Sequence, residues 1–248
     1  MNCKNCKTEI HSKFCPDCGQ PTSLKRIERK YIFSEIENVL NFERGIFYTI
    51  RELIINPGQN IRNYLSEDRS RLVKPVTFVI LTSLIYSITI SIFYIEEQYV
   101  KFQHEGGKIS TAMTIFQWIQ GHYGYSNIVM GVFIALWINL FFKKHKYNFF
   151  EILVVLCFVI GIAMLIFSIF AMLQGITSLK ISQIGGIIGV IYSSWAIGQF
   201  FGKEKLFNYI KALFAYLIGM ITFIFLVISI GILFDLFLQH SSTLNLME

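Results

Sequence analysis

Charged residues are scarce in this chain. Only 15% of its 248 residues are Asp, Glu, Lys or Arg, whereas a soluble domain carries about 25%. The scarcity is uneven, because residues 1–74 hold 13 of the 22 Lys and Arg and 9 of the 16 Asp and Glu. The remainder of the chain is correspondingly apolar, and hydrophobic residues make up 54% of the whole. This distribution excludes a single water-soluble domain and predicts a polar head joined to a membrane-embedded body.

Several patterns that would indicate chemistry are also missing. The chain has no glycine-rich loop that could cradle a phosphate, and its serines and histidines form no recognisable nucleophile motif. The basic residues near the start have no aromatic stripe beside them, so nucleic acid is not an expected partner. No apolar run follows the start directly, so we expect no cleavable signal peptide. These absences predict a protein that is not an enzyme.

Four cysteines stand at the front of the chain, in the segment CKNCKTEIHSKFCPDCGQ. Cys3, Cys6, Cys15 and Cys18 form two CxxC pairs, which is the spacing of a structural zinc site. Four thiolates fill a tetrahedral shell and leave no position for a catalytic water. In an oxidising compartment the same residues could form two disulfides instead. The prediction of structural Zn²⁺ therefore depends on the head lying in the reducing cytosol.

The chain divides into four predicted parts. Residues 1–20 form the zinc ribbon, 21–30 a polar linker, 31–74 amphipathic cytosolic or interfacial helices, and 75–248 the membrane domain. Apolar residues recur with helical spacing in 32–40 and 46–54, Asn56-Pro57-Gly58 ends the second helix, and a third short helix is expected over 59–65. Basic residues that either bind anionic lipid or fix the orientation lead into the first span. They are Arg62, Arg69, Arg71 and Lys74.

Five apolar stretches are long enough to cross a bilayer, which takes about 20 residues as a helix. They cover 75–95, 125–142, 152–173, 181–201 and 212–238. If the head is cytoplasmic, 19 of the 22 Lys and Arg lie on the cytoplasmic side, in agreement with the positive-inside rule. We therefore expect an all-α polytopic membrane protein, a five-helix bundle with its N-terminus in the cytoplasm and its C-terminus outside.

Few side chains within the spans suggest a site. Asp235, near the end of the fifth span, is the candidate for an ion or proton role, although it could simply mark the end of the span. Glycines four residues apart, Gly185 with Gly189 and Gly198 with Gly202, predict close helix packing around a central fourth span.

Three motifs resemble those of an uncharacterised bacterial family that joins an N-terminal zinc ribbon to several membrane spans. They are FCPDCGQ, FERGIFYTIRELIINPGQNIRNYL and RSRLVKPVTFVILTSLIY, and the resemblance covers residues 3–90. The order of an amphipathic helix, a proline and five spans also resembles the Yip1 group, which is associated with membrane traffic and organisation. These resemblances imply the bacterial inner membrane and a structural zinc, but no activity.

The leading hypothesis is a scaffold or adaptor in membrane organisation, whose zinc ribbon docks or senses a cytosolic protein partner. The alternative is a transporter or channel for a small solute or ion. Its pathway would be lined by polar residues of the spans, which are Asn139, Ser168, Gln174, Ser193, Ser194 and Gln199. A membrane-bound lipid-handling protein is a third possibility.

Overall fold

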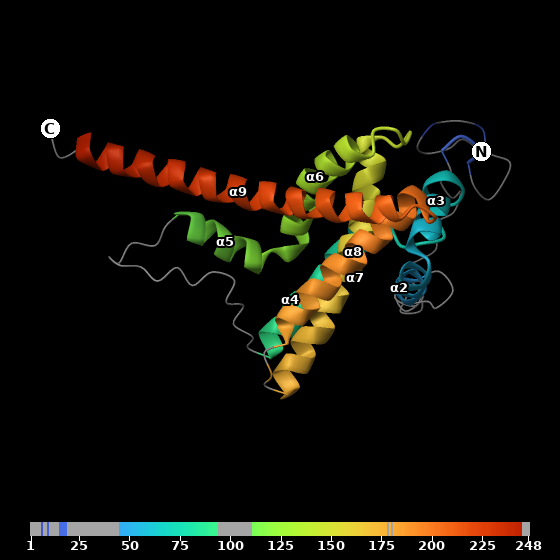
Figure 1. Cartoon of the computed structure of the whole chain (residues 1–248), viewed down its shortest axis with the longest axis horizontal. Helices are drawn as coiled ribbons and strands as arrows, with labels where there is room; N and C mark the ends of the chain where they lie inside the picture. The colour runs from blue at the N-terminus through green and yellow to red at the C-terminus, as the bar shows by residue number, and fades with distance from the viewer. Residues whose placement is uncertain are drawn as a thin grey trace. The chain divides into compact units, whose positions relative to one another are not determined.

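Helices make up the regular secondary structure in the described part of the chain (Figure 1). The computed structural model describes residues 6, 9, 15–18, 45–93, 111–177, 179 and 181–244, without the side chains of Gln120 and of residues beyond Phe237. The chain separates into two compact units, Met1–Asn41 and Phe42–Glu248. Among the residues just given there are eight helices and no strand, and all eight helices belong to the second unit.

Five of the helices are long and apolar enough to cross a membrane, as predicted. They are α4 (Pro75–Ile92), α6 (Tyr123–Phe141), α7 (Phe149–Thr177), α8 (Ser182–Gly202) and α9 (Leu206–Leu244). The 18 residues of α4 span about 27 Å at 1.5 Å per residue. This length is close to the hydrocarbon thickness of a bilayer, which is about 30 Å. The five helices indicate a membrane protein.

The helices α4, α7 and α8 lie side by side (Figure 1). Gly161 of α7 lies against the ring of Phe78 in α4, and Gly185 of α8 lies against Phe170 of α7. The absence of a side chain at these glycines lets the backbones approach closely.

The helix that contacts the most neighbours is α7, which packs against α2, α3, α4, α6 and α8. The sequence predicted this central place for the fourth span, α8, which contacts α3, α7 and α9. Residues 158–164 of α7 are all buried, so this helix is enclosed on every side at that level. A helix that is apolar all round is suited to such a position. The glycines of α8 therefore allow close contacts with its neighbours, but the central helix of the bundle is α7.

The helix α9 begins beside α8 and then leaves it (Figure 1). Gly202, with φ +149°, allows the turn between the two helices, and Tyr209 of α9 then covers Gly198 of α8. Further along, α9 packs against α6 and against α5 (Thr111–Gly121). Trp137 of α6 donates a hydrogen bond to Thr222 of α9 at 3.0 Å. The fifth predicted span begins at 212, whereas the helix already begins at Leu206.

Two short helices precede the first span. They are α2 (Ile46–Ile55) and α3 (Pro57–Ser66), joined at Asn56. Pro57 is the first residue of α3, where its missing N–H removes no helical hydrogen bond. The pair packs on α7 and α8. The helix predicted over 32–40 lies outside the described residues.

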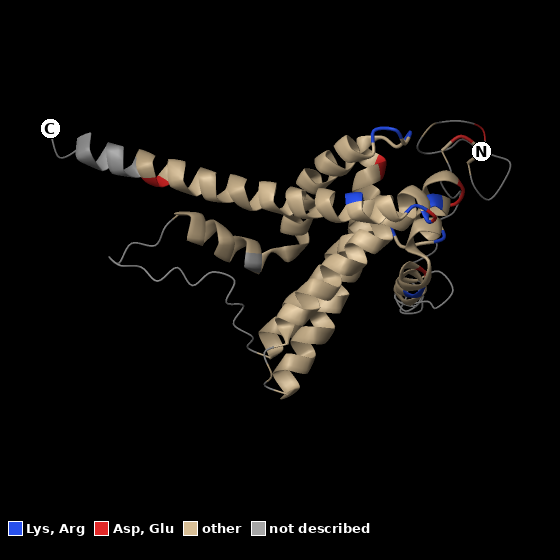
Figure 2. Cartoon of the chain, viewed as in Figure 1, with Lys and Arg blue, Asp and Glu red and all other residues tan. Residues whose placement is uncertain are grey.

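The positive charges of the second unit gather at one end of the helices (Figure 2). They lie on α2 and α3, before α4, between α6 and α7, between α8 and α9, and in the first turns of α9. In the described part of the chain, no Lys or Arg lies at the opposite end of α4, α7 and α8. The end where α4, α7 and α9 begin is therefore the basic end of the bundle.

Candidate functional site

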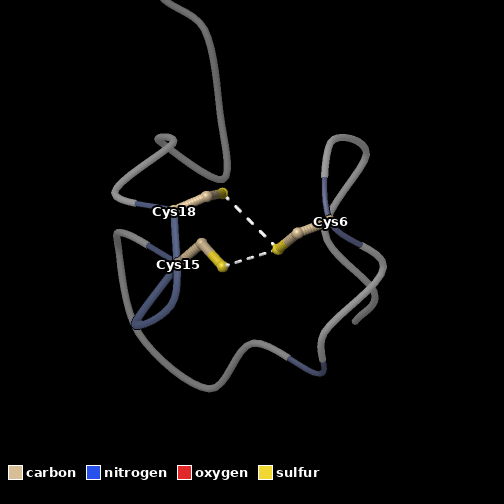
Figure 3. A group of neighbouring side chains, drawn as sticks. All are labelled: Cys6, Cys15 and Cys18. Carbon is tan, nitrogen blue, oxygen red and sulfur yellow. Dashed lines mark hydrogen bonds between the residues drawn. The ribbon is translucent and has the colours of Figure 1, made fainter.

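Three of the four predicted zinc ligands come together in the first unit. Cys6 Sγ lies 3.4 Å from Cys15 Sγ and 3.5 Å from Cys18 Sγ (Figure 3). All three sulfur atoms lie within 4.8 Å of one another. Cys15 is buried, whereas Cys6 and Cys18 are exposed. We call these residues the thiol cluster. Cys3, the fourth predicted ligand, lies outside the described residues.

The geometry of the thiol cluster fits a tetrahedral metal ion. Four sulfurs about 2.3 Å from a zinc ion are about 3.8 Å from each other, which is close to the separations in the cluster. A disulfide would require about 2.05 Å between two sulfurs, which is much shorter than the 3.4 and 3.5 Å from Cys6 Sγ to the sulfurs of Cys15 and Cys18. The three side chains converge from two separate loops (Figure 3). The cluster can therefore supply three thiolate ligands to Zn²⁺.

The thiol of Cys15 is hard to ionise without a cation. Backbone hydrogen bonds from Cys18 and Asp17 favour its thiolate, but burial and the neighbouring thiols of Cys6 and Cys18 outweigh them and raise its pKa to about 11. A bound divalent cation reverses this balance, because it stabilises several thiolates at once. Cys157, the other cysteine among the described residues, belongs to the second unit and lies within α7.

Arg62 is the basic residue whose place differs most from the prediction. Its Nη1 donates hydrogen bonds to the carbonyl oxygens of Gln199 at 2.7 Å and Phe200 at 2.8 Å. Both carbonyls lie in the last turn of α8, where no intrahelical partner exists and the helix dipole is negative. Arg62 therefore caps α8.

The other three basic residues occupy different surroundings. The Nε of Arg71 donates to the hydroxyl of Tyr48 at 2.8 Å, and its Nη2 lies 3.5 Å from a carboxylate oxygen of Glu52. The hydrogen bond with Tyr48 and the charge of Glu52 both raise the pKa of Arg71. Arg69 and Lys74 are exposed. Arg69 and Lys74 are thus the members of the set whose side chains extend into the surroundings of the protein.

The turn between α2 and α3 is held by polar contacts that the sequence did not indicate. Asn60 Nδ2 donates to the carbonyl oxygens of Glu52 at 2.8 Å and Asn56 at 3.1 Å. The hydroxyl of Tyr192, in the middle of α8, donates to the carbonyl of Leu53 at 3.0 Å. Free carbonyls at the end of α2 thereby find partners within the protein.

Gly58 allows α3 to approach α8 very closely. Its N–H lies 3.3 Å from Oε1 of Gln199, to which it donates a hydrogen bond. A Cβ at this position would be only 2.5 Å from the carbonyl carbon of Gln199. Together with Arg62, Gly58 makes the first turns of α3 complementary to the end of α8. The asparagine-proline-glycine motif identified a turn, but nothing local indicated this contact.

Asp235 accepts hydrogen bonds at the start of α5. Its carboxylate accepts from the N–H of Thr111 at 3.1 Å and from the hydroxyl of the same residue. This arrangement is an N-terminal cap supplied by a different helix. The carboxylate of Asp235 thus makes a structural contact, and its ion or proton role stays a prediction.

Most polar residues proposed to line a pathway are hydrogen-bonded to the backbone. The hydroxyls of Ser168, Ser193 and Ser194 each donate to the carbonyl four residues earlier in their own helix. Gln174 accepts from the N–H of Ser182 at 3.0 Å. Gln199 contacts Gly58 as described above, and Asn139 is exposed on α6. Five of the six residues therefore have partners that explain their presence in apolar helices.

Comparison with known proteins identifies one domain. A family model described as a protein of unknown function (DUF3667) matches residues 43–87, which cover α2, α3 and most of α4. No curated protein and no solved structure matches the chain. The predicted similarity to the Yip1 group stays a prediction. The chain therefore contains a domain of an uncharacterised family, and this domain includes Gly58, Arg62 and the turn between α2 and α3.

Proposed function

We propose that this chain is a non-enzymatic integral protein of the bacterial inner membrane, in which a zinc-bound N-terminal module docks a cytosolic protein. The observation that carries the proposal is the convergence of Cys6, Cys15 and Cys18 within 4.8 Å. With Cys3 as the fourth ligand, zinc has a closed shell and holds a segment too short to build a core. Small zinc modules of this kind present a rigid surface without doing chemistry.

The distribution of charge supports a cytoplasmic position for this module. All described Lys and Arg of the second unit lie at the basic end of the bundle (Figure 2). By the positive-inside rule this end faces the cytoplasm. The N-terminal unit precedes α2 in the chain and therefore emerges on the same side. An odd number of spans then puts the C-terminus outside, and the reducing cytosol keeps the thiols available for a metal.

The polar residues of the spans favour an adaptor over a transporter. A transport pathway requires polar groups that are available to a solute, whereas five of the six candidates are hydrogen-bonded to the backbone. The bundle then serves to anchor the module.

Metal analysis of the purified full-length protein tests the zinc site. We expect about one zinc per chain, because the four thiols form a single tetrahedral site. The double variant Cys15→Ser/Cys18→Ser should lose the metal. Cys157→Ser should retain it, since this thiol lies within α7. Wild-type protein that contains no stoichiometric zinc would overturn the proposal.

Docking is tested with the same variants, cross-linked in intact cells and purified from the membrane. A cytosolic protein that is captured by the wild type and by Cys157→Ser, but not by the double variant, supports a docking role. As a control, the membrane fraction must contain as much of the double variant as of the wild type. Identical captured proteins in all three samples would refute docking even if the zinc is present.

A further inference from the structure

The helix α2 has three distinct faces. Residues of an α-helix are about 100° apart around its axis, so the direction of each side chain follows from its position. Ile46, Thr49 and Leu53 point in one direction, and all three are buried against the protein. Tyr48 and Glu52 point about 120° away and contact Arg71. The third direction belongs to Ile50, Ile54 and Phe47.

The third face is apolar and exposed. Ile54 is 55% exposed and Phe47 is 48% exposed, whereas Ile50 is half-buried. A helix that only packed on a bundle in water would carry polar residues at these positions. The polar side of α2 is instead formed by Tyr48 and Glu52, next to Arg71, whose side chain is 41% exposed. The helix therefore separates an apolar side, a polar side and a side that packs on the bundle.

The position of α2 beside the spans identifies what covers its apolar face. This helix contacts α7 and accepts a hydrogen bond from Tyr192 of α8, and both of these helices are long and apolar enough to cross a membrane. Thr49 of α2 accepts a hydrogen bond from the N–H of Val73, just before α4, so α2 also lies at the basic end of the bundle. Exposed apolar residues of α4 and α8, such as Ile80, Leu84 and Ile191, require lipid around the spans.

We infer that α2 lies in the plane of the bilayer surface, with Ile54, Ile50 and Phe47 inserted into the acyl boundary of the leaflet at the basic end. Tyr48, Glu52 and Arg71 then face water. Arg51, exposed and between the two faces, reaches the lipid phosphates, as long basic side chains do at such interfaces. The exposed Arg69 and Lys74 favour anionic lipid in this leaflet.

Carbonyl groups at the C-terminal end of α2 accept hydrogen bonds from the protein itself. The carbonyl of Glu52 accepts from Asn60 and from the N–H of Asn56, and the carbonyl of Leu53 accepts from Tyr192. The last carbonyls of a helix usually rely on water. Here the protein supplies the hydrogen-bond donors instead. Backbone carbonyls at the boundary of a bilayer need such partners, because little water is available there. This inference goes beyond the proposed docking function and does not depend on the zinc.

Tryptophan fluorescence in vesicles of dibrominated phosphatidylcholine and phosphatidylglycerol tests the inference. Ile54→Trp and Tyr48→Trp are compared in a full-length background with Trp118, Trp137 and Trp195 replaced by Phe. The bromolipid should quench Ile54→Trp at least about twofold more than Tyr48→Trp, because the two side chains point about 120° apart around the helix, one toward lipid and the other toward water. Aqueous iodide should give the opposite order.

Two results would overturn the inference. If iodide quenches Ile54→Trp as strongly as Tyr48→Trp, the apolar face is in water. If neither bromolipid nor iodide quenches Ile54→Trp, a protein surface covers it. The unmodified chain provides a second measurement that no substitution can disturb. A phospholipid with a photoactivatable acyl chain should label α2 at Phe47, Ile50 or Ile54, and absence of label on α2 would also reject the inference.

Discussion

Replacing Gly58 by alanine is expected to push α3 away from α8. The new Cβ would lie 2.5 Å from the carbonyl carbon of Gln199 and 2.6 Å from its oxygen, whereas ordinary contacts begin at 3.4 Å. The atoms that it meets are backbone, which cannot rotate aside. The helices must therefore separate by about 1 Å, a forced overpacking of the kind that costs about 1–3 kcal/mol.

The separation would also weaken the hydrogen bonds around it. The bond from Gly58 N–H to Gln199 is already 3.3 Å long, and Arg62 holds its two carbonyls at 2.7 and 2.8 Å. Loss of one such bond costs about 1 kcal/mol. Alanine recovers at most about 1 kcal/mol through its higher helix propensity. We expect Gly58→Ala to lower the free energy of unfolding by about 1–3 kcal/mol in total.

Gly186→Ala provides the matched control for this substitution. Gly186 lies in α8, and a Cβ there would meet no heavy atom within 4 Å. We expect this variant to be unchanged or up to about 1 kcal/mol more stable, because alanine restricts the unfolded chain. Unfolding of both variants by sodium dodecyl sulfate in mixed micelles, followed by far-UV circular dichroism, measures the difference. Equal midpoints for the two would refute the close approach of α3 to α8.

Three other perturbations are predicted from the same contacts. Arg62→Met should lower the free energy of unfolding by about 2 kcal/mol, because two carbonyls of α8 lose a charged donor, while Arg69→Met should change it by less than about 0.5 kcal/mol. Equal midpoints of Arg62→Met and Arg69→Met in the unfolding by sodium dodecyl sulfate would contradict the capping role. Asp235→Asn should destabilise the start of α5 by about 1 kcal/mol and speed amide exchange there, while exchange in α7 stays unchanged. The same exchange rate at the start of α5 in the variant and the wild type would contradict the cap. A zinc chelator should make the N-terminal unit sensitive to protease without altering the helical signal of the spans. Resistance that persists after the metal is removed would show that zinc does not hold the fold of this unit.

The number of spans was predictable because it depends on local properties. Length and apolar composition identify each membrane helix without knowledge of its neighbours. The last helix extends beyond the predicted span 212–238, since it already begins at Leu206 and includes Lys211. The ammonium group of Lys211 lies 4.8 Å from the ring centre of Phe207, so the charge is accommodated on the helix surface. The helix therefore continues through the basic residue.

The roles of the basic residues could not be predicted, because their partners are distant in the sequence. Arg62 and Arg69 look equivalent in a polar segment before a span, but only Arg62 reaches the carbonyls of α8, 137 and 138 residues away. The same limit applies to Gly58, whose partner Gln199 is 141 residues away. Cysteine spacing, in contrast, has chemical meaning by itself, and it predicted the approach of Cys6, Cys15 and Cys18.

The matched segment 43–87 cannot fold as a transferable module. Leu53, Ile61 and Phe78 are fully buried, and Phe78 and Tyr64 both pack against Phe158 of α7. Cut out of the chain, this segment would present these side chains to solvent and would leave Arg62 without the carbonyl oxygens of Gln199 and Phe200 to which it donates. Any protein that carries the segment must therefore also carry a receiving surface equivalent to α7 and the end of α8, even where the sequence of that surface has diverged.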